Sequence, residues 1–273
     1  MKTLGKIYSV FIYLCLYAPL VIMVLYSFNA KRSTSALSFD YAANSNFEFG
    51  HWYAEAFQNG YALNALRNSL ILALLSALAA TLLGTLAAYG LHHLKMRRIR
   101  TAITTVTNIP MMNPDIVTGI SMMLLFATVF AIVRIGETGF ATLLIAHITF
   151  NLPYVILSIM PRLRQMDKNL PEAALDLGCT PIQSFFMVQL PFLFPAILSG
   201  FIMAFTLSLD DYVISLFLSG PKFETLPVFI FGLARKSVPP TIYALSTLFL
   251  VMVLGLLIFS NIMQARMEKK SKI

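Results

Sequence analysis

Charged residues are scarce in this chain. Asp, Glu, Lys and Arg together make up 12% of its 273 residues, whereas an ordinary soluble domain carries about 25%. Hydrophobic residues reach 58%, and the mean hydropathy is +0.76. These values exclude an ordinary soluble domain, because burying so much apolar sequence would need a much larger chain. A bilayer is the solvent that fits, since a helix of about 20 apolar residues crosses its hydrocarbon and satisfies its own backbone groups.

Cysteine, histidine and catalytic motifs are also scarce. The two cysteines, Cys15 and Cys179, fall in an apolar segment and in a polar loop, so we expect no disulfide. The four histidines include the adjacent pair His92-His93 but do not compose a metal site. The chain has no Walker A glycine loop, no Gly-x-Ser-x-Gly and no His-Glu-x-x-His. We therefore predict no catalytic residue, no metal and no cofactor in this chain.

Six long apolar segments are the main positive feature. Four contain no Asp, Glu, Lys or Arg, the third contains Asp115, and the fifth contains Asp210 and Asp211. The segments are continuously apolar and do not alternate every second residue, which favours helices over a membrane β-barrel. The sequence predicts an all-α integral membrane protein with one domain, 1–273, and spans at about 7–28, 69–91, 103–133, 140–161, 192–218 and 242–263.

Basic residues are distributed unevenly around these spans. Of the 20 Lys and Arg residues, thirteen lie on the side of the two termini and seven on the other. Because cytoplasmic loops carry an excess of Lys and Arg, we expect both termini in the cytoplasm. The net charge of +8 then reflects a basic rim that faces anionic lipid, and not a nucleic-acid surface. The thirteen are Lys2, Lys6, Lys95, Arg97, Arg98, Arg100, Arg162, Arg164, Lys168, Arg266, Lys269, Lys270 and Lys272; the seven are Lys31, Arg32, Arg67, Arg134, Lys222, Arg235 and Lys236.

The polar loop between the fourth and fifth spans has the residues of a helix pair. Pro171 suits the first turn of a helix, where its missing N–H is not needed, and Glu172 is favoured there by the helix dipole. Ala173 and Ala174 are strong helix formers whose small side chains let a partner surface approach closely. Gly178 is expected to end this helix with a positive φ. We predict two short helices at an angle, which form a rigid knob on the cytoplasmic side.

The spacing within this loop is specific. Glu172-Ala173-Ala174 is followed by three residues and Gly178; after nine further residues comes Val188, where Ile is more usual, and after Gln189 comes Leu190-Pro191. This pattern resembles the loop by which ABC importer permeases hold their ATPase. The alternative is a solvated hairpin that merely links two spans. The resemblance implies a coupling loop at 165–191, with coupling to the ATPase through Glu172, Ala173, Ala174, Asp176, Gly178, Leu190 and Pro191.

Three further stretches extend the resemblance over nearly the whole chain. Residues 110–117, 146–150 and 205–214 are similar to the polyamine branch of these permeases, in particular to the second permease subunit of the spermidine/putrescine importers. Relatives that move oxyanions carry a Gly-Glu-Phe-Gly-like stretch where this chain has Leu209-Asp210-Asp211-Tyr212. The resemblance implies a binding-protein-dependent permease with the type I ABC importer fold. The alternative is an importer for another small organic cation or solute.

The same resemblance implies what such a subunit works with. We expect a second homologous permease, two ATP-binding subunits, an extracytoplasmic substrate-binding protein and a polyamine substrate, in the lipid of a bacterial cytoplasmic membrane. ATP and Mg would lie in the partner ATPase. This chain itself would therefore be no enzyme and would hold no cofactor, and no nucleic acid is expected as a partner.

The acids in the apolar spans need a physical reason. A carboxylate at the bilayer centre costs roughly 2.5–3.5 kcal/mol, and the spans that carry Asp115, Asp210 and Asp211 hold no Lys or Arg as a partner. An acidic path for a cargo with several ammonium groups is one explanation, to which Tyr212 would add a cation–π contact of about 0.5–2 kcal/mol. These four residues are the candidate pathway residues.

Each acid also has a structural interpretation. Asp115 follows a proline and is equally suited to cap a helix start. Asp210 and Asp211 are adjacent, so on a helix they point about 100° apart and cannot both face one path. One would meet the cargo while the other caps a broken helix or pairs with the partner permease. His147 and Asn151, one turn apart, are expected to form interhelical hydrogen bonds.

Overall fold

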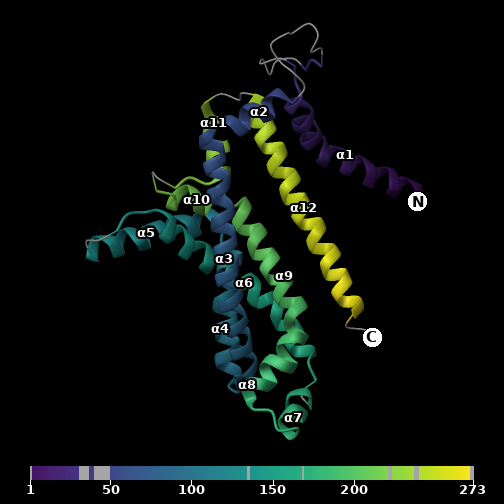
Figure 1. The fold of residues 1–273 in the computed structure, drawn as a ribbon, viewed down its shortest axis with the longest axis vertical. Helices are drawn as coiled ribbons and strands as arrows, with labels where there is room; N and C mark the ends of the chain where they lie inside the picture. Colours follow the sequence, from purple (N-terminus) through teal and green to yellow (C-terminus); the bar gives the residue numbers. More distant parts are fainter. Residues whose placement is uncertain are drawn as a thin grey trace. The chain divides into compact units, whose positions relative to one another are not determined.

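The described chain is helical. The computed structural model describes residues 2–30, 37–39, 50–133, 136–167, 169–220, 223–236 and 240–270, and these residues contain no strand (Figure 1). Six of the basic residues used to predict orientation, Lys31, Arg32, Arg134, Lys168, Lys222 and Lys272, lie outside them. The helices are α1 (Lys2–Ser27), α2 (His51–Gln58), α3 (Gly60–His93), α4 (Arg97–Met112), α5 (Asp115–Val133), α6 (Phe140–Gln165), α7 (Asn169–Asp176), α8 (Pro181–Ser184), the π-helix η1 (Phe185–Gln189), α9 (Leu190–Asp210), α10 (Val213–Leu218), α11 (Leu226–Lys236) and α12 (Pro240–Lys270).

Six helical stretches are long and apolar enough to cross a membrane. They begin in α1, α3, α5, α6, α8 and α12, and the one that begins in α8 runs on through η1 and α9. Their large apolar side chains are widely exposed, as in α1, where the candidate span buries none of its residues. Exposed apolar helices of this length suit contact with lipid. The all-α, six-span prediction is confirmed.

Two of the predicted spans are divided by breaks. Residues 103–133 are split between α4 and α5 at Asn113, which has φ −78° and ψ 140°. The cause is Pro114, whose ring disfavours helical backbone at the residue before it. Residues 192–218 are split between α9 and α10, with Asp211 extended at φ −63° and ψ 124°. Two shorter helices therefore replace a single continuous helix in each of these spans.

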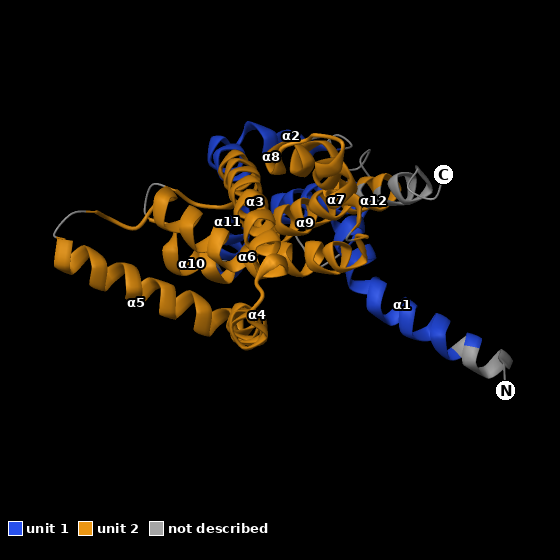
Figure 2. Cartoon of the chain, turned by 90° about the horizontal axis from the view of Figure 1, so that it is seen from below, with its two compact units in different colours: residues 1–66, 226–255 blue, residues 67–225, 256–273 orange. Residues whose placement is uncertain are grey.

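The described residues group into two compact units (Figure 2), which we describe separately. Unit 1 comprises Met1–Leu66 and Leu226–Gly255, and unit 2 comprises Arg67–Thr225 and Leu256–Ile273. One domain over 1–273 stays a prediction.

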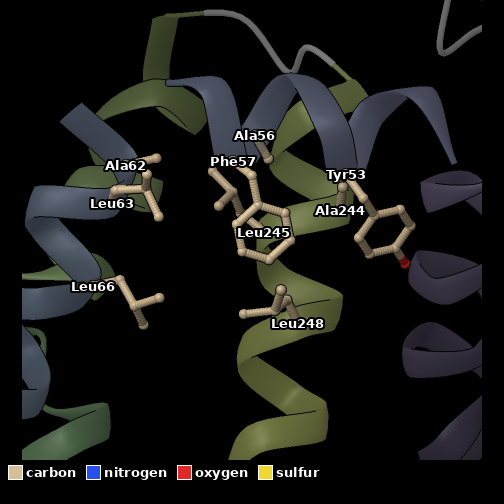
Figure 3. Close-up of a pocket in the computed structure, with 9 residues that line it drawn as sticks. All are labelled: Tyr53, Ala56, Phe57, Ala62, Leu63, Leu66, Ala244, Leu245 and Leu248. Atoms are coloured by element: carbon tan, nitrogen blue, oxygen red, sulfur yellow. The ribbon is translucent and has the colours of Figure 1, made fainter. Parts of the chain in front are cut away.

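Unit 1 has a small apolar core. Ala56, Ala62 and Leu245 are buried together, and the Trp52 indole N–H donates a 2.6 Å hydrogen bond to the carbonyl of Asn29. A pocket next to this core has a volume of about 10 Å³, which is space for a single water molecule at most. It is therefore too small to hold an organic cargo. Figure 3 shows its lining: Tyr53, Ala56, Phe57, Ala62, Leu63, Leu66, Ala244, Leu245 and Leu248.

Unit 2 is built on the packing of α6 against α9. Small residues let the helices approach closely, as is common between membrane helices. A Cβ on Gly84 of α3 would lie only 2.6 Å from Cγ1 of Val155 on α6. The resulting core fixes α6 and α9 beside α3, and both helices carry candidate site residues. Its buried members are Ala77, Ala80, Ala88, Leu91, Val155, Ile156, Ile159, Met160, Leu163, Leu193 and Ala204.

Candidate functional site

A buried chain of polar side chains connects α3, α6, α9 and α10 in unit 2. His147 of α6 is fully buried, and its Nδ1 lies 2.6 Å from Oγ of Ser208 on α9. Ser208 in turn lies 2.8 Å from Oγ of Ser76 on α3. On the other side of the ring, Nε2 is 3.4 Å from Oγ of Ser215 and 3.5 Å from Oδ2 of Asp211. The predicted interhelical hydrogen bonding of His147 is confirmed.

Asp211 stabilises the start of α10. Its side chain is only 8% exposed. Oδ2 accepts a 2.8 Å hydrogen bond from the backbone N–H of Ser215, and Oδ1 accepts a 3.3 Å bond from that of Ile214. These N–H groups belong to the first turn of α10, which has no partner for them within the helix. A buried carboxylate is tolerated when it is paired and hydrogen-bonded, and His147 with the first turn of α10 supplies both conditions.

Asp210 has the opposite environment. It ends α9, and its side chain is exposed although Asp211 beside it is nearly buried. Asp115, the first residue of α5, is exposed as well, and the two carboxylates interact electrostatically with each other. Exposed acids that repel one another favour a cation between them. The structure therefore exposes Asp115 and Asp210, whereas Asp211, which also acts electrostatically on Asp210, is nearly buried.

Two residues that the sequence did not single out lie near Asp115, and one of them, Gly119, is buried. Tyr154 of α6 is half-buried and interacts electrostatically with Asp115. Gly119 lets α5 approach α10, because a Cβ there would lie 2.8 Å from Cδ2 of Phe217. Tyr154 follows His147 by seven residues, which is two helical turns, and this spacing could have indicated it. Tyr212, the remaining candidate, is half-buried and directly precedes α10.

Asn151 lies one turn from His147 and is fully buried. Neither its Oδ1 nor its Nδ2 has a hydrogen-bond partner among the described residues. The hydrogen bonds predicted for Asn151 are therefore not present there, so that part of the prediction is wrong. Buried amides are normally bonded, and α6 thus carries an unsatisfied polar group inside unit 2.

The loop 165–191 contains the two short helices that its sequence predicts. Gly178 lies between α7 and α8 with φ +91°, which confirms the predicted positive φ. Thr180 caps α8: its hydroxyl accepts a 3.3 Å bond from the backbone N–H of Gln183, and the Gln183 side chain accepts a 2.8 Å bond from the N–H of Thr180. This reciprocal capping box fixes the start of α8. Ser184 then donates a 3.4 Å bond to the carbonyl of Pro171, which ties the two helices together.

The candidate coupling residues are mostly on the surface of this loop. Ala174 is buried and Leu190 half-buried, whereas Glu172, Ala173, Asp176, Gly178 and Pro191 are exposed. Large apolar side chains beside them face outward, with Leu177 86% exposed. Contiguous exposed apolar side chains mark interaction sites. The others with large exposure are Leu170, Leu175, Ile182, Phe186 and Met187.

Known proteins resemble the chain in sequence and in fold. The family described as "Binding-protein-dependent transport system inner membrane component" matches residues 80–273. The chain is 41% identical over 236 residues to the putrescine transport system permease protein PotI of Escherichia coli (strain K12), covering 86% of this chain and 81% of that one. It is 37% identical over 251 residues to the spermidine/putrescine transport system permease protein PotC of Haemophilus influenzae, covering 92% of each. Both of these relatives are transport permeases and not enzymes.

A solved structure shares the fold at low sequence identity. A bacterial alginate ABC transporter in complex with alginate pentasaccharide-bound periplasmic protein matches with a TM-score of 0.74 and 16% identity, covering 97% of this chain and 94% of that one. This similarity shows the fold of an ABC importer permease, because identity at this level carries no information on the cargo.

Proposed function

The chain belongs to the binding-protein-dependent transport system inner membrane components, and we propose that it is the permease subunit of an ATP-driven ABC importer for polyamines. The observation that carries the proposal is its similarity, over most of the chain, to permeases named for putrescine and for spermidine/putrescine transport. This subunit forms half of the translocation pathway, and a second homologous permease forms the other half.

The acidic surface of unit 2 supports a polycationic cargo. Asp115 and Asp210 are both exposed and interact with each other electrostatically. A cargo with two ammonium groups neutralises both carboxylates at once. Tyr212 follows Asp210 by two residues and Tyr154 interacts electrostatically with Asp115, and a ring beside an ammonium contributes about 0.5–2 kcal/mol. A few weak contacts of this kind suit a path that has to release its cargo.

Asp211 has a different function in this proposal. Its carboxylate is bonded to the first turn of α10 and lies beside His147, so it positions the break between α9 and α10. Asp210 is the last residue of α9 and is exposed, whereas the extended backbone at Asp211 directs its carboxylate to the first turn of α10. Asp211 is therefore a positioning residue, and Asp210 and Asp115 contact the cargo.

The loop 165–191 couples this subunit to ATP hydrolysis in a partner. Its exposed apolar side chains and its capped, glycine-ended helices form a rigid surface on which an ATPase subunit docks. Two ATP-binding subunits, which hold ATP and Mg, drive the movement, and an extracytoplasmic binding protein delivers the polyamine. The chain spans the bacterial cytoplasmic membrane with both termini in the cytoplasm, as the excess of basic residues on that side supports.

Transport follows alternating access driven by the partner. ATP binding closes the two ATPase subunits, and the movement passes through α7 and α8 into the spans. The path then opens outward to the loaded binding protein and the cargo passes Asp210 and Asp115. Hydrolysis resets the inward-facing state.

Uptake of labelled putrescine and spermidine tests the proposal. The chain is expressed with its partner subunits in cells that lack other polyamine importers, and ATP-dependent uptake is measured for the wild type, Asp210→Asn and Asp211→Asn. Glu137→Gln is the matched control, because Glu137 is an exposed acid of unit 2 away from the breaks. We expect wild-type uptake of at least one polyamine, about tenfold lower uptake in Asp210→Asn, and normal uptake in the control.

The outcomes separate the parts of the proposal. An intact, ATP-hydrolysing complex that takes up neither polyamine would refute the substrate class and favour another organic cation. Uptake that is normal in Asp210→Asn would refute the contact of Asp210 with the cargo while leaving the importer in place. A loss in Asp211→Asn that accompanies a loss of folded protein supports the positioning role of Asp211.

A further inference from the structure

A polar groove lies between α4 and α6 of unit 2, apart from the acidic surface. Its volume is about 500 Å³, within the range of about 300–1,000 Å³ that small-ligand pockets have. Arg97 and Arg100 of α4 and Arg164 of α6 line it, together with Thr104 and Asn108. Guanidinium groups bind phosphate oxygens in a bidentate manner, and hydroxyl and amide groups add hydrogen bonds. The groove thus has the chemistry of a phosphate site.

The three arginines have no acidic partner in the described chain. The close contacts between a basic side chain and a carboxylate there join His51 with Glu55 and His147 with Asp211, and neither contact involves Arg97, Arg100 or Arg164. Three like charges around one groove repel each other, so an anion that enters it relieves this repulsion. A polyamine is excluded by the same argument, which separates the groove from the cargo path.

The helix α4 has a polar face, which lines the groove, and a separate apolar face. Its polar side chains recur every three or four residues and line the groove over about three turns, or roughly 16 Å. Its apolar side chains recur at the same spacing on another face and are exposed, among them Val106 at 63%. An apolar stripe beside a basic groove at a span end suits a molecule with a charged head and an apolar tail. The exposed apolar residues are Ile99, Ile103, Val106 and Ile109.

We infer that the groove binds the phosphate headgroup of an anionic phospholipid, whose acyl chains lie along the apolar stripe of α4. The arginines contact the phosphate oxygens, and Thr104 and Asn108 contact the glycerol region. Clusters of basic residues between membrane helices on the cytoplasmic side are suited to such headgroups. A free phosphate would use the same arginines but would gain nothing from the apolar stripe, which favours the lipid.

Native mass spectrometry of the chain purified with its partner subunits tests this inference. The complex is reconstituted in vesicles with equal amounts of phosphatidylglycerol and phosphatidylcholine, and the lipid that stays bound after extraction is counted. The test variant is Arg97→Gln with Arg100→Gln. The matched control is Lys95→Gln with Arg98→Gln, which removes the same charge from exposed neighbours that do not line the groove.

We expect the wild type and the control to retain phosphatidylglycerol selectively, and the groove variant to retain about tenfold less. Arg97→Lys with Arg100→Lys keeps the charge but loses the bidentate geometry, so its retention should be intermediate. An equal loss in the groove variant and the control would overturn the inference in favour of diffuse attraction to the basic rim. Binding of inorganic phosphate to the wild type, with no selective retention of phosphatidylglycerol, would overturn the lipid and assign a free anion. Dissociation of the partner subunits in the groove variant would overturn the site in favour of a subunit interface.

Discussion

Two helix starts in unit 2 are stabilised by the same kind of hydrogen bond in opposite surroundings. Thr180 caps α8 on an exposed loop, where water can replace the bond if the side chain is removed. Asp211 caps α10 inside the helix packing, where His147 lies 3.5 Å from its carboxylate and only 8% of its side chain is exposed. The comparison teaches that the local motif determines where a helix begins, whereas burial determines how much stability depends on it.

The largest effect is expected from Asp211→Ala. The substitution leaves His147 and two backbone N–H groups of α10 without their acceptor in a buried place, and each unsatisfied donor costs about 1–3 kcal/mol. The yield and thermal unfolding temperature of the purified protein should fall sharply. Asp210→Ala is the control, because Asp210 is exposed and its loss should leave the unfolding temperature unchanged. Equal unfolding temperatures for the two variants would contradict the difference between these adjacent acids.

Gly178→Val should be next, because it acts on the loop and not on the core. Gly178 has φ +91° with nothing within 4 Å of an added Cβ, so the cost is backbone strain of roughly 1–2 kcal/mol. We expect ATP-dependent uptake to fall by about tenfold or more, with the spans still folded. Gly178→Asn should retain most of the uptake, since Asn tolerates positive φ. Identical uptake in both variants would show that coupling does not depend on the backbone conformation at Gly178.

Leu177→Ser tests the docking surface with a smaller expected effect. Leu177 is 86% exposed, and partial burial of a leucine against a partner stabilises by about 0.8–1.5 kcal/mol. The affinity for the ATPase subunits, measured by titration of the reconstituted complex, should fall by about tenfold. Tyr61→Ser is the matched control, because Tyr61 is 81% exposed in unit 1. Comparable losses of affinity in both variants would show that the loop has no specific role in docking the ATPase subunits.

The smallest effect is expected from Thr180→Ala. Loss of an exposed N-cap costs about 1 kcal/mol, and the effect should stay local. Hydrogen exchange of the α8 amides should become about fivefold faster, while the amides of α9 and α10 exchange as in the wild type. Faster exchange throughout α10 would show that the exposed and the buried cap are energetically linked, contrary to the comparison above.

Some features of the site were predictable and others were not. The positive φ of Gly178 followed from its place after a run of helix formers, and the six spans followed from apolar length. The break at Asn113 could also have been predicted from the sequence, because a proline restricts the backbone of the residue before it. The missing partners of Asn151 were not predictable, because a buried amide is expected to find a bond. Tyr154 escaped notice because its relation to Asp115 joins two helices that are distant in the sequence.

The sequence by itself determined the apolar spans, the two short helices of the loop 165–191 and the presence of two adjacent acids near the end of the fifth span. Those properties depend on residue type and local spacing. Only the tertiary structure decided that Asp211 is buried beside His147 while Asp210 is exposed with Asp115. The physical reason is that the helix α9 ends between the two acids, with Asp210 helical and Asp211 extended, and local spacing does not indicate which acid faces the core. The packing of α6 and α10 around Asp211 determines that Asp211, and not Asp210, is buried.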